Sequence, residues 1–399
     1  MTSSAISPRP LAGIKVLELG QLIAGPFAGK ILAEFGAEVI KIEPPGGGDP
    51  LRQWRLLHDG TSLWWYVQAR NKKSVTANLR SAEGQEIVRR LARDADIVVE
   101  NFRPGTMEAW NVGPGDLDPR LVYVRISVFG QDGPWSKRPG LDRLGIAYGG
   151  LLHLTGYPDR PPVRPGVTVS DYLTGVFAAE AALAALYARD ARGGGTGAVV
   201  DAPLYGSVLR ILEWTIAGHD RLGIVRSREG NRLANSAPLD NYLSADGRYV
   251  CIVAGSDTNF ARLCRAMGRE ELIDDPRFAN LEERARNGEV INGLVADWCA
   301  GLTAPDIEKA CLAFDVPVGT AYDAHDITTD THMAARGDLV TVDDPVVGPV
   351  RQQAPYPRLS TMPPTPPRGA PRLGEHNDEV WTEVLGAEKY GQAREAGVV

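Results

Sequence analysis

Short apolar runs alternate with longer amphipathic segments through the first third of the chain. The short runs are rich in β-branched residues and predict strands, whereas the longer segments have the three-to-four-residue apolar spacing of helices. Strands that alternate with helices predict βαβ units, and therefore a parallel sheet covered by helices on its faces. The predicted strands are residues 14–19, 38–43, 96–100 and 121–128, and the predicted helices are residues 26–35 and 82–93.

The pattern changes near Asp171. Residues 167–169 are β-branched and predict a short strand, while residues 172–187 form an Ala- and Leu-rich run with helical spacing. Asp171 is therefore expected where a strand becomes a helix. Unpaired backbone N–H groups and the positive end of the helix dipole favour an ionised carboxylate there. Asp171 is either a helix cap, which is the commoner role for such a residue, or a nucleophile.

The second half of the chain indicates a further domain. The length of the full chain, 399 residues, also favours two domains. Residues 198–200 predict a strand and 204–217 a helix, after which residues 219–236 are irregular and polar. A compact α+β segment follows, with a hairpin-like pattern over 241–250. The Pro-rich residues 354–371 are too dense in proline for a helix and are expected to be extended, before a helix within 374–385.

Two polar stretches are predicted as loops at strand edges, NKKS at 71–74 and NFRPG at 101–105. Open α/β sheets commonly bind ligands at such edges, and cationic loops suit a ligand with phosphates. Solvated turns are the alternative for both. Near the first helix, Gly20, Gly25, Gly29 and Glu43 superficially match a dinucleotide-binding fingerprint. The glycine spacing is wrong for that motif, so tight packing is the favoured interpretation.

Composition narrows the function classes. The 43 basic and 50 acidic residues give a net charge of −7 without a long basic run, which argues against a nucleic-acid partner. Residues 1–10 lack the apolar core of a signal peptide, and residues 176–188 are too short to span a membrane. The four cysteines form no CxxC pair and fit a reducing, cytoplasmic location. His325 and His332, with Asp326 and Asp330, match no standard metal spacing, so no metal site is predicted.

Several ordered motifs together resemble the class III CoA-transferases. This family includes formyl-CoA, carnitine-CoA and succinyl-CoA-dependent transferases and the α-methylacyl-CoA racemases. The resemblance covers residues 11–385, nearly the whole chain. The motifs that carry it are LAGIKVLE at 11–18, AGP at 24–26, FGAEVIKIE at 35–43, NKKS at 71–74, ENFRPG at 100–105 and LGEH at 373–376.

The resemblance implies an α/β fold: a Rossmann-like large domain with a parallel sheet, plus a small α+β domain. It also implies that two linkers interlock two subunits as a homodimer. On this basis the large domain comprises residues 1–218 and 358–399 and the small domain residues 240–324, joined by linkers at 219–239 and 325–357.

The resemblance further implies an acyl-CoA:carboxylate CoA-transferase that works through aspartyl anhydride and aspartyl-CoA thioester intermediates on Asp171. A dicarboxylate such as succinate is the expected kind of acid. Asp142 either supports the site or caps a helix. CoA and acyl-CoA are expected as substrates, with no tightly bound cofactor. The positions that match CoA contacts in the family are Leu22, Ile23, Lys72, Asn78, Leu79, Arg80, Asn101, Phe102 and Arg103, of which Arg80 and Arg103 are assigned to phosphates and Lys72 is a weaker candidate.

Two departures from the family pattern bear on the reaction. Formyl-CoA transferases have a glutamine where this chain has Ile23, which argues against formate or oxalate as a substrate. Racemases have a histidine in a Gly-His-Asp stretch where this chain has Leu141, and leucine cannot transfer a proton. A 2-methylacyl-CoA racemase or epimerase is therefore disfavoured. Two more functions stay open at this point, a non-catalytic CoA-binding protein and a nicotinamide dehydrogenase.

Overall fold

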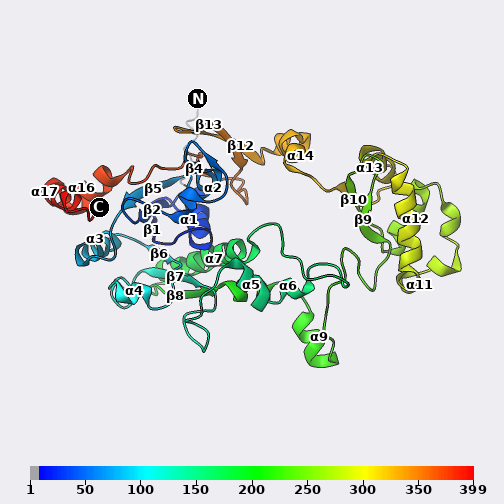
Figure 1. Cartoon of the computed structure of the whole chain (residues 1–399), viewed down its shortest axis with the longest axis horizontal. Coiled ribbons are helices and arrows are strands. Elements are labelled where there is room, and N and C mark those ends of the chain that lie inside the picture. Colours follow the sequence, from blue (N-terminus) through cyan, green and yellow to red (C-terminus); the bar gives the residue numbers. More distant parts are fainter. Residues whose placement is uncertain (1–8) are drawn as a thin grey trace. The chain divides into compact units, whose positions relative to one another are not determined.

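The computed structural model describes residues 9–399. The sequence predicts no signal peptide in residues 1–10. Of these, residues 1–8 lie outside the described residues. Contacts between residues divide the described chain into two compact units, each with its own buried core (Figure 1). The first unit contains the described residues up to Leu151, together with Pro165–Ile216 and Ala335–Val399. The second unit contains Leu152–Arg164 and Ala217–Ala334.

The first unit is built on a six-stranded sheet in which every neighbouring pair is parallel. The strand order is β5-β2-β1-β6-β7-β8, so the chain works outward from β1 on one side and then from β6 on the other. This is the doubly wound order of a Rossmann-like fold, and it confirms the predicted parallel sheet. The strands are β1 (Lys15–Glu18), β2 (Glu38–Glu43), β5 (Lys72–Thr76), β6 (Ile97–Glu100), β7 (Val122–Ser127) and β8 (Val199–Pro203).

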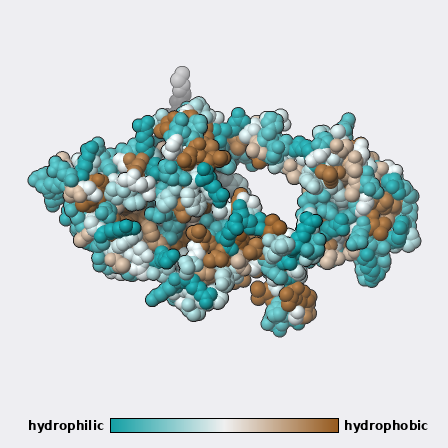
Figure 2. All heavy atoms as spheres, in the orientation of Figure 1, coloured by the Kyte–Doolittle hydropathy of each residue, from teal (hydrophilic) through white to brown (hydrophobic). Residues whose placement is uncertain are grey.

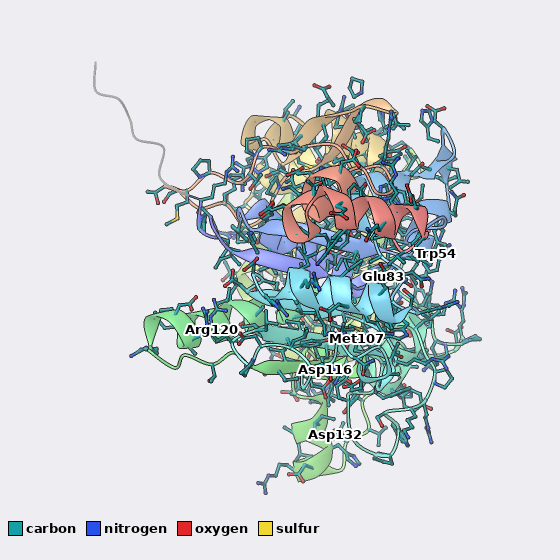
Figure 3. The ribbon with its side chains drawn as sticks, turned by 90° about the vertical axis from the view of Figure 1, so that its left-hand side faces the viewer. Trp54, Glu83, Met107, Asp116, Arg120 and Asp132 are labelled. Carbon is teal, nitrogen blue, oxygen red and sulfur yellow. The ribbon has the colours of Figure 1, made fainter. Side chains whose placement is uncertain are left out.

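Successive residues of the central strands pack on opposite faces of this sheet. Val16 belongs to the core under α1 (Ala24–Glu34) and α7 (Val169–Ala191), whereas Leu17 belongs to the core on the other face. That second face is covered by α3 (Ala82–Ala92), α16 (Asn377–Leu385) and α17 (Ala387–Glu395). Figure 3 looks onto it, with Glu83 in α3 and the buried Met107 labelled. A sheet buried on both faces explains why its strands are almost continuously apolar.

Helix α7 is long and apolar enough to cross a membrane by length and composition alone. Its buried side chains include Ala178, Ala182 and Leu186, which pack in one core with Val122 and Val124 of the sheet. These contacts account for its hydrophobicity as that of a core helix.

Three local predictions were wrong. Residues 167–169 form no strand, because no neighbouring strand pairs with them, and α7 already begins at Val169 after Thr168 as N-cap. Residues 71–74 were expected to be a loop, but Lys72–Thr76 is the edge strand β5. Its two lysines hid the strand, because Lys72 is buried with an ion-pair partner. The helix expected over 204–217 is broken into α8 (Leu204–Arg210) and α9 (Thr215–Leu222).

The second unit contains a three-stranded antiparallel sheet with strand order β11-β10-β9, and β9 and β10 form the expected hairpin. Its core includes Cys264, Cys299 and Cys311, which pack as small apolar residues. Burial raises the pKa of each of these thiols. The elements are β9 (Leu239–Leu243), β10 (Tyr249–Val253), α10 (Asp257–Ala266), η2 (Glu270–Leu272), η3 (Pro276–Phe278), α11 (Leu281–Arg286), α12 (Gly288–Ala300), α13 (Ala304–Leu312), β11 (Val318–Thr320), α14 (Ala324–Thr329) and α15 (Thr331–Arg336).

The Pro-rich segment, residues 354–371, contains no helix and no strand, and it belongs to the first unit. It follows the hairpin of β12 (Leu339–Asp344) and β13 (Gly348–Gln353). The Thr365 N–H donates to Glu34 O over 2.9 Å, and Pro371 O accepts from Arg52, so backbone polar groups tie it down. The remaining elements are η1 (Pro50–Gln53), β3 (Leu57–His58), β4 (Thr61–Ser62), α2 (Leu63–Gln68), α4 (Thr106–Ala109), α5 (Asp142–Tyr148) and α6 (Leu151–Leu154).

Candidate active site

Asp171 lies in the first turn of α7, where it is partly buried. The N-cap residue, Thr168, makes no side-chain capping hydrogen bond. Asp142 supplies the cap instead: its Oδ1 accepts from Ser170 N over 2.9 Å, from Ser170 Oγ over 2.8 Å and from Asp171 N over 3.4 Å. Asp171 is therefore not the cap of its own helix, and its carboxylate is left for other uses.

Asp142 itself is 6% exposed and is the first residue of α5. Its carboxylate therefore lies at the N-terminal ends of both α5 and α7, where helix dipoles stabilise negative charge. The two helices come so close that a Cβ at Gly145 would lie 2.6 Å from Ser170 Oγ. A larger residue at position 145 would push the cap away from α7.

The environment of Asp171 makes its carboxyl group unusually basic. Burial raises the pKa of Asp171 to about 7, and the nearby negative charge of Asp142 acts in the same direction. Within residues 9–399, neither carboxylate oxygen of Asp171 accepts a hydrogen bond. A basic carboxylate in such a position is suited to attack an electrophile or accept a proton.

The first-turn N–H groups of α7 are all used within the chain. Ser170 N and Asp171 N donate to Asp142, Val169 N donates to Val167 O over 3.0 Å, and Tyr172 N donates to Thr168 O over 3.1 Å. The position of these N–H groups at the start of a helix suggests that they could stabilise an oxyanion. Because each of them already donates a hydrogen bond within the chain, they do not fit that role.

Aromatic side chains surround the residue after Asp171. The Tyr172 ring packs edge-on against Phe27 with centroids 4.7 Å apart. Its hydroxyl accepts a hydrogen bond of 2.9 Å from Trp64 Nε1. Burial, together with the negative charge of Asp171, raises the pKa of Tyr172, so this hydroxyl stays neutral near the carboxylate. Trp64 in α2 was not predicted from the sequence.

The loop after β1 meets the loop after β6 at the carboxyl edge of the sheet. Between these two neighbouring strands the winding direction reverses, and open α/β sheets bind ligands at such a switch point. Asn101 joins the two loops, since its Oδ1 accepts from Gln21 N and its Nδ2 donates to Gln21 O, each over 2.7 Å. Leu22 and Ile23 follow directly. The structure thus brings together three of the predicted CoA-contact positions, Leu22, Ile23 and Asn101. The side-chain amide of Asn101 forms its hydrogen bonds with the backbone of Gln21.

Lys72 has a structural role in this structure. Its Nζ is fully buried, 2.7 Å from Glu18 Oε2 and 2.7 Å from Pro26 O. Burial, the largest of several opposing influences, lowers the pKa of its ammonium group. An enclosed ammonium does not fit a phosphate contact, so we no longer assign Lys72 to CoA.

The other predicted cations face solvent. Arg80 follows β5 and Arg103 follows β6, both are exposed, and neither guanidinium forms an ion pair with any of the residues described. Asn78 and Leu79 are half-buried, and Asn78 Oδ1 accepts from Arg80 N over 3.1 Å. The Phe102 ring packs edge-on against Trp110.

The carboxylate of Glu43 is occupied by hydrogen bonds within the chain, so it is not available to bind the hydroxyl groups of a ribose. It accepts two hydrogen bonds of 2.8 Å from Arg52 and one of 2.6 Å from Ser74 Oγ. These contacts lower the pKa of Glu43 despite its burial. The structure therefore removes the remaining support for a nicotinamide dehydrogenase.

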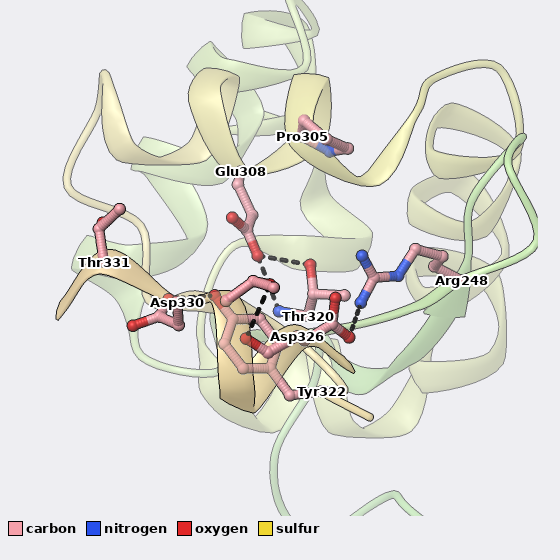
Figure 4. A pocket seen from close by; sticks show the side chains of 9 residues that line it. Arg248, Pro305, Glu308, Thr320, Tyr322, Asp326, Asp330 and Thr331 are labelled. Carbon is pink, nitrogen blue, oxygen red and sulfur yellow. Dashed lines mark hydrogen bonds and ion pairs between the residues drawn. The ribbon is translucent and has the colours of Figure 1, made fainter. Parts of the chain in front are cut away.

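A separate cavity of about 310 Å³ lies in the second unit (Figure 4). Its carboxylates are occupied by the chain itself: Glu308 accepts from Thr320, Asp326 pairs with Arg248, and Asp330 accepts from Tyr322. Across residues 9–399, no three His, Cys, Asp or Glu side chains are grouped to hold a metal ion. Asp171 and the switch-point loops in the first unit are the stronger candidate site.

Comparison with known proteins agrees with this architecture. The sequence profile of CoA-transferase family III matches residues 11–377. The chain belongs to CoA-transferase family III. It is accordingly an enzyme that acts on CoA thioesters, as the resemblance of its motifs had predicted.

Relatives of this CoA-transferase are similar over most of their length. It is 45% identical over 388 residues to a succinyl-CoA--D-citramalate CoA-transferase of Chloroflexus aurantiacus, covering 96% of both chains. It is 33% identical over 405 residues to a human succinyl-CoA:glutarate CoA-transferase, covering 98% of this chain and 90% of that one. A CAIB/BAIF family protein from Brucella suis has a similar structure, with a TM-score of 0.86 and 32% identity, covering 95% of this chain and 100% of that chain.

Sequence patterns found some parts of the CoA-transferase's candidate site and missed others. The sequence singled out Asp171, Asp142 and both switch-point loops. Helix capping was one of the two roles considered for Asp142, but the sequence did not show that the capped helix is α7, because Asp142 and Ser170 are 28 residues apart and only the fold joins them. Sequence patterns also missed Asp49, although Gly-Asp-Pro before η1 is an N-cap signal, and Asp49 does cap η1.

Proposed function

We propose that this enzyme transfers CoA from succinyl-CoA to a short dicarboxylate, with Asp171 as the covalent nucleophile. The carrying observation is the carboxylate of Asp171 at the start of a capped helix, basic and without a hydrogen-bond partner among the described residues. The substrate class is supported by the relatives, whose names pair succinyl-CoA with D-citramalate, L-malate or glutarate.

The proposed chemistry proceeds in four balanced steps. A carboxylate oxygen of Asp171 attacks the thioester carbonyl of succinyl-CoA, giving a mixed anhydride and CoA thiolate. The thiolate attacks the aspartyl carbonyl and forms an aspartyl-CoA thioester, which releases succinate. The acceptor carboxylate then attacks this thioester and expels the thiolate again. Finally the thiolate attacks the acceptor's carbonyl in the new anhydride, which frees the Asp171 carboxylate.

The leaving groups make these steps reasonable at neutral pH. A thiol has a pKa of roughly 8.5, so thiolate departs far more readily than an alkoxide would. A raised pKa makes the Asp171 carboxylate a better nucleophile than an ordinary aspartate, while about half of it remains ionised near pH 7.

Asp142 acts in this proposal through Asp171. Its carboxylate fixes the first turn of α7 and adds negative charge beside the nucleophile. Leu141, which precedes it, is 64% exposed and offers no acid or base. A racemase would need a second proton-transfer group there, so CoA transfer is favoured over racemisation.

We expect Arg80 and Arg103 to hold phosphates of CoA, because both are exposed at the carboxyl edge of the sheet without an ion-pair partner in the described chain. Arg80→Ala and Arg103→Ala are each expected to raise KM for succinyl-CoA roughly tenfold and to leave kcat nearly unchanged. Steady-state kinetics at two salt concentrations measure this. A matched control is Arg160→Ala, since Arg160 is also exposed. An equal effect in all three variants would contradict the assignment.

We also propose the family's domain division and its interlocked homodimer. None of the residues in α9, α14 and α15 is buried in the single chain. Exposed apolar side chains gather over α9, among them Trp214, Ile216 and Leu222 (Figure 2). Helices with so little burial are marginal alone and are expected to be covered by a partner. The proposed linker of residues 219–239 begins within α9. The proposed linker of residues 325–357 contains α15 and all of α14 except its first residue.

The dimer has a direct test. Light scattering after size-exclusion chromatography is expected to give twice the chain mass of 43.0 kDa. Leu222→Glu, a change on the surface of α9, is expected to weaken the dimer, whereas Glu388→Lys on α17 serves as a surface control. A stable monomer at micromolar concentration would contradict the proposal.

The reaction is tested by incubating the enzyme with succinyl-CoA and a panel of acids, and separating the CoA thioesters by chromatography. Short dicarboxylates are expected to become thioesters, and a monocarboxylate of equal length is expected to react poorly. Parallel incubation of a 2-methylacyl-CoA in deuterated water tests racemisation. Deuterium incorporation without any acceptor acid, and no CoA transfer, would overturn the transferase proposal.

A further inference from the structure

The loop at the switch point contains a strained residue. Leu22 has φ of 62°, in the left-handed region that side-chain-bearing residues rarely adopt. Such a conformation is energetically unfavourable and persists only where the surrounding structure holds it in place. Backbone strain of this kind is concentrated at functional sites.

Side chains from other parts of the unit hold the backbone of this loop. The Leu22 N–H donates to both carboxylate oxygens of Asp49, over 3.1 and 3.2 Å. Asn101 holds both the N–H and the carbonyl of Gln21. Gln68 Nε2 donates to Ile23 O over 2.9 Å. The backbone of three consecutive residues, 21–23, is thus held by three side chains. These come from the N-cap of η1, from the residue after β6 and from α2.

A buried ion network lies beneath these contacts. Lys41 Nζ is 2.8 Å from Asp49 Oδ2 and 3.0 Å from Glu18 Oε1, and it donates to Gly20 O over 2.7 Å. Lys72 pairs with the other Glu18 oxygen and donates to Pro26 O. Both lysines are thereby anchored to the backbone on either side of Leu22. Buried ion pairs are weak evidence for stability, because desolvation offsets their attraction.

The held segment packs directly on the helix that carries Asp171. A Cβ at Gly175, one turn after Asp171, would lie 2.9 Å from Ala24 O, so only glycine fits this approach. Phe27 packs against Tyr172 in the same region. Any movement of the residues from Gly20 to Ala24 would therefore change the surroundings of the first turns of α7.

We propose that Asp49 and Asn101 are positioning residues: they lock Leu22 in its left-handed conformation and so hold the loop from Gly20 to Ile23 in one arrangement beside Asp171. Neither residue needs to touch the reacting atoms. A thioester must be held within about 3–3.5 Å of the attacking oxygen for efficient reaction, and a mobile wall loses that alignment. This inference rests on the proposed function.

The test compares Asn101→Ala and Asp49→Asn with Asn292→Ala. Asn292 is a matched control in the second unit, where its Oδ1 accepts from Leu239 N and from the Tyr242 hydroxyl. Each of the three variants removes or weakens two or more buried or partly buried hydrogen bonds and is expected to lower thermal stability comparably. Should Asp49→Asn fail to fold because Lys41 loses an anion, Asn101→Ala decides the question.

Two readouts separate positioning from a purely structural role. In both loop variants, hydrogen exchange at residues 20–23 is expected to quicken, and the single-turnover rate of CoA adduct formation on Asp171 is expected to fall at least tenfold, with KM for succinyl-CoA within about threefold. Asn292→Ala is expected to change neither. Adduct formation at the wild-type rate in both loop variants would overturn this inference alone. No adduct in the wild-type enzyme would overturn the proposed function, and this inference with it.

Discussion

Asp171→Asn is expected to reduce CoA transfer by at least about a thousandfold, because an amide cannot attack a thioester and form the anhydride. No CoA adduct is expected on the variant. Its fold is expected to persist, since the Asp171 side chain accepts no hydrogen bond within residues 9–399 and Asp142 provides the helix cap. Chromatographic assay of CoA thioesters measures the loss of activity.

The control for this variant is Asp190→Asn on the same helix. Asp190 forms an ion pair with Arg189 at the far end of α7. That variant is expected to retain activity within about threefold, because the Asp190 side chain is half exposed and Arg189 keeps its ion pair with Asp96. If Asp171→Asn kept more than a tenth of the wild-type activity, Asp171 could not be the nucleophile.

The rate of the first half-reaction is expected to fall about tenfold per pH unit below roughly pH 7, where Asp171 becomes protonated. The direction follows from the pKa: burial and then the charge of Asp142 favour the neutral acid, which is not a nucleophile. An ordinary aspartate would show no such acid limb above about pH 5. The pH profile of kcat/KM for succinyl-CoA, at constant ionic strength, measures it.

Asp142→Asn is expected to move this acid limb to lower pH. The amide removes one negative charge, while its oxygen still accepts from Ser170, so the pKa of Asp171 falls but stays raised by burial. Ser170→Ala is the comparison, because it loses one hydrogen bond to the cap and keeps the charge. An unshifted limb in Asp142→Asn would show that Asp142 only holds the helix.

The fold was predictable where apolar spacing is regular. Strands such as Ile97–Glu100 are buried on both faces, so their continuous hydrophobicity is enough to identify them. Strand Lys72–Thr76 escaped prediction because its buried lysine is neutralised by Glu18, which lies far away in sequence. The strand predicted at residues 167–169 was wrong for the opposite reason. β-Branched residues favour a strand only when another strand pairs with them.

The candidate site was predictable to the level of its chemistry-bearing residues, but not of their relationships. Asp171 stood out by its position before a long helix. That Asp142 caps this helix, and that Asn101 holds Gln21 across the switch point, depends on contacts between segments that no local pattern connects. The assignment of Lys72 to CoA failed because sequence shows a cation's presence and not its burial.

The central claim is that Asp171 carries the CoA in covalent form, and an oxygen-labelling measurement tests it most directly. In the proposed steps, the acceptor acid gives one of its carboxylate oxygens to Asp171 when the last anhydride is opened. After turnover with succinyl-CoA and heavy-oxygen-labelled dicarboxylate, mass spectrometry of the peptide that contains Asp171 is expected to show heavy oxygen in its carboxyl group. Efficient transfer of CoA with no label in that peptide would contradict the account.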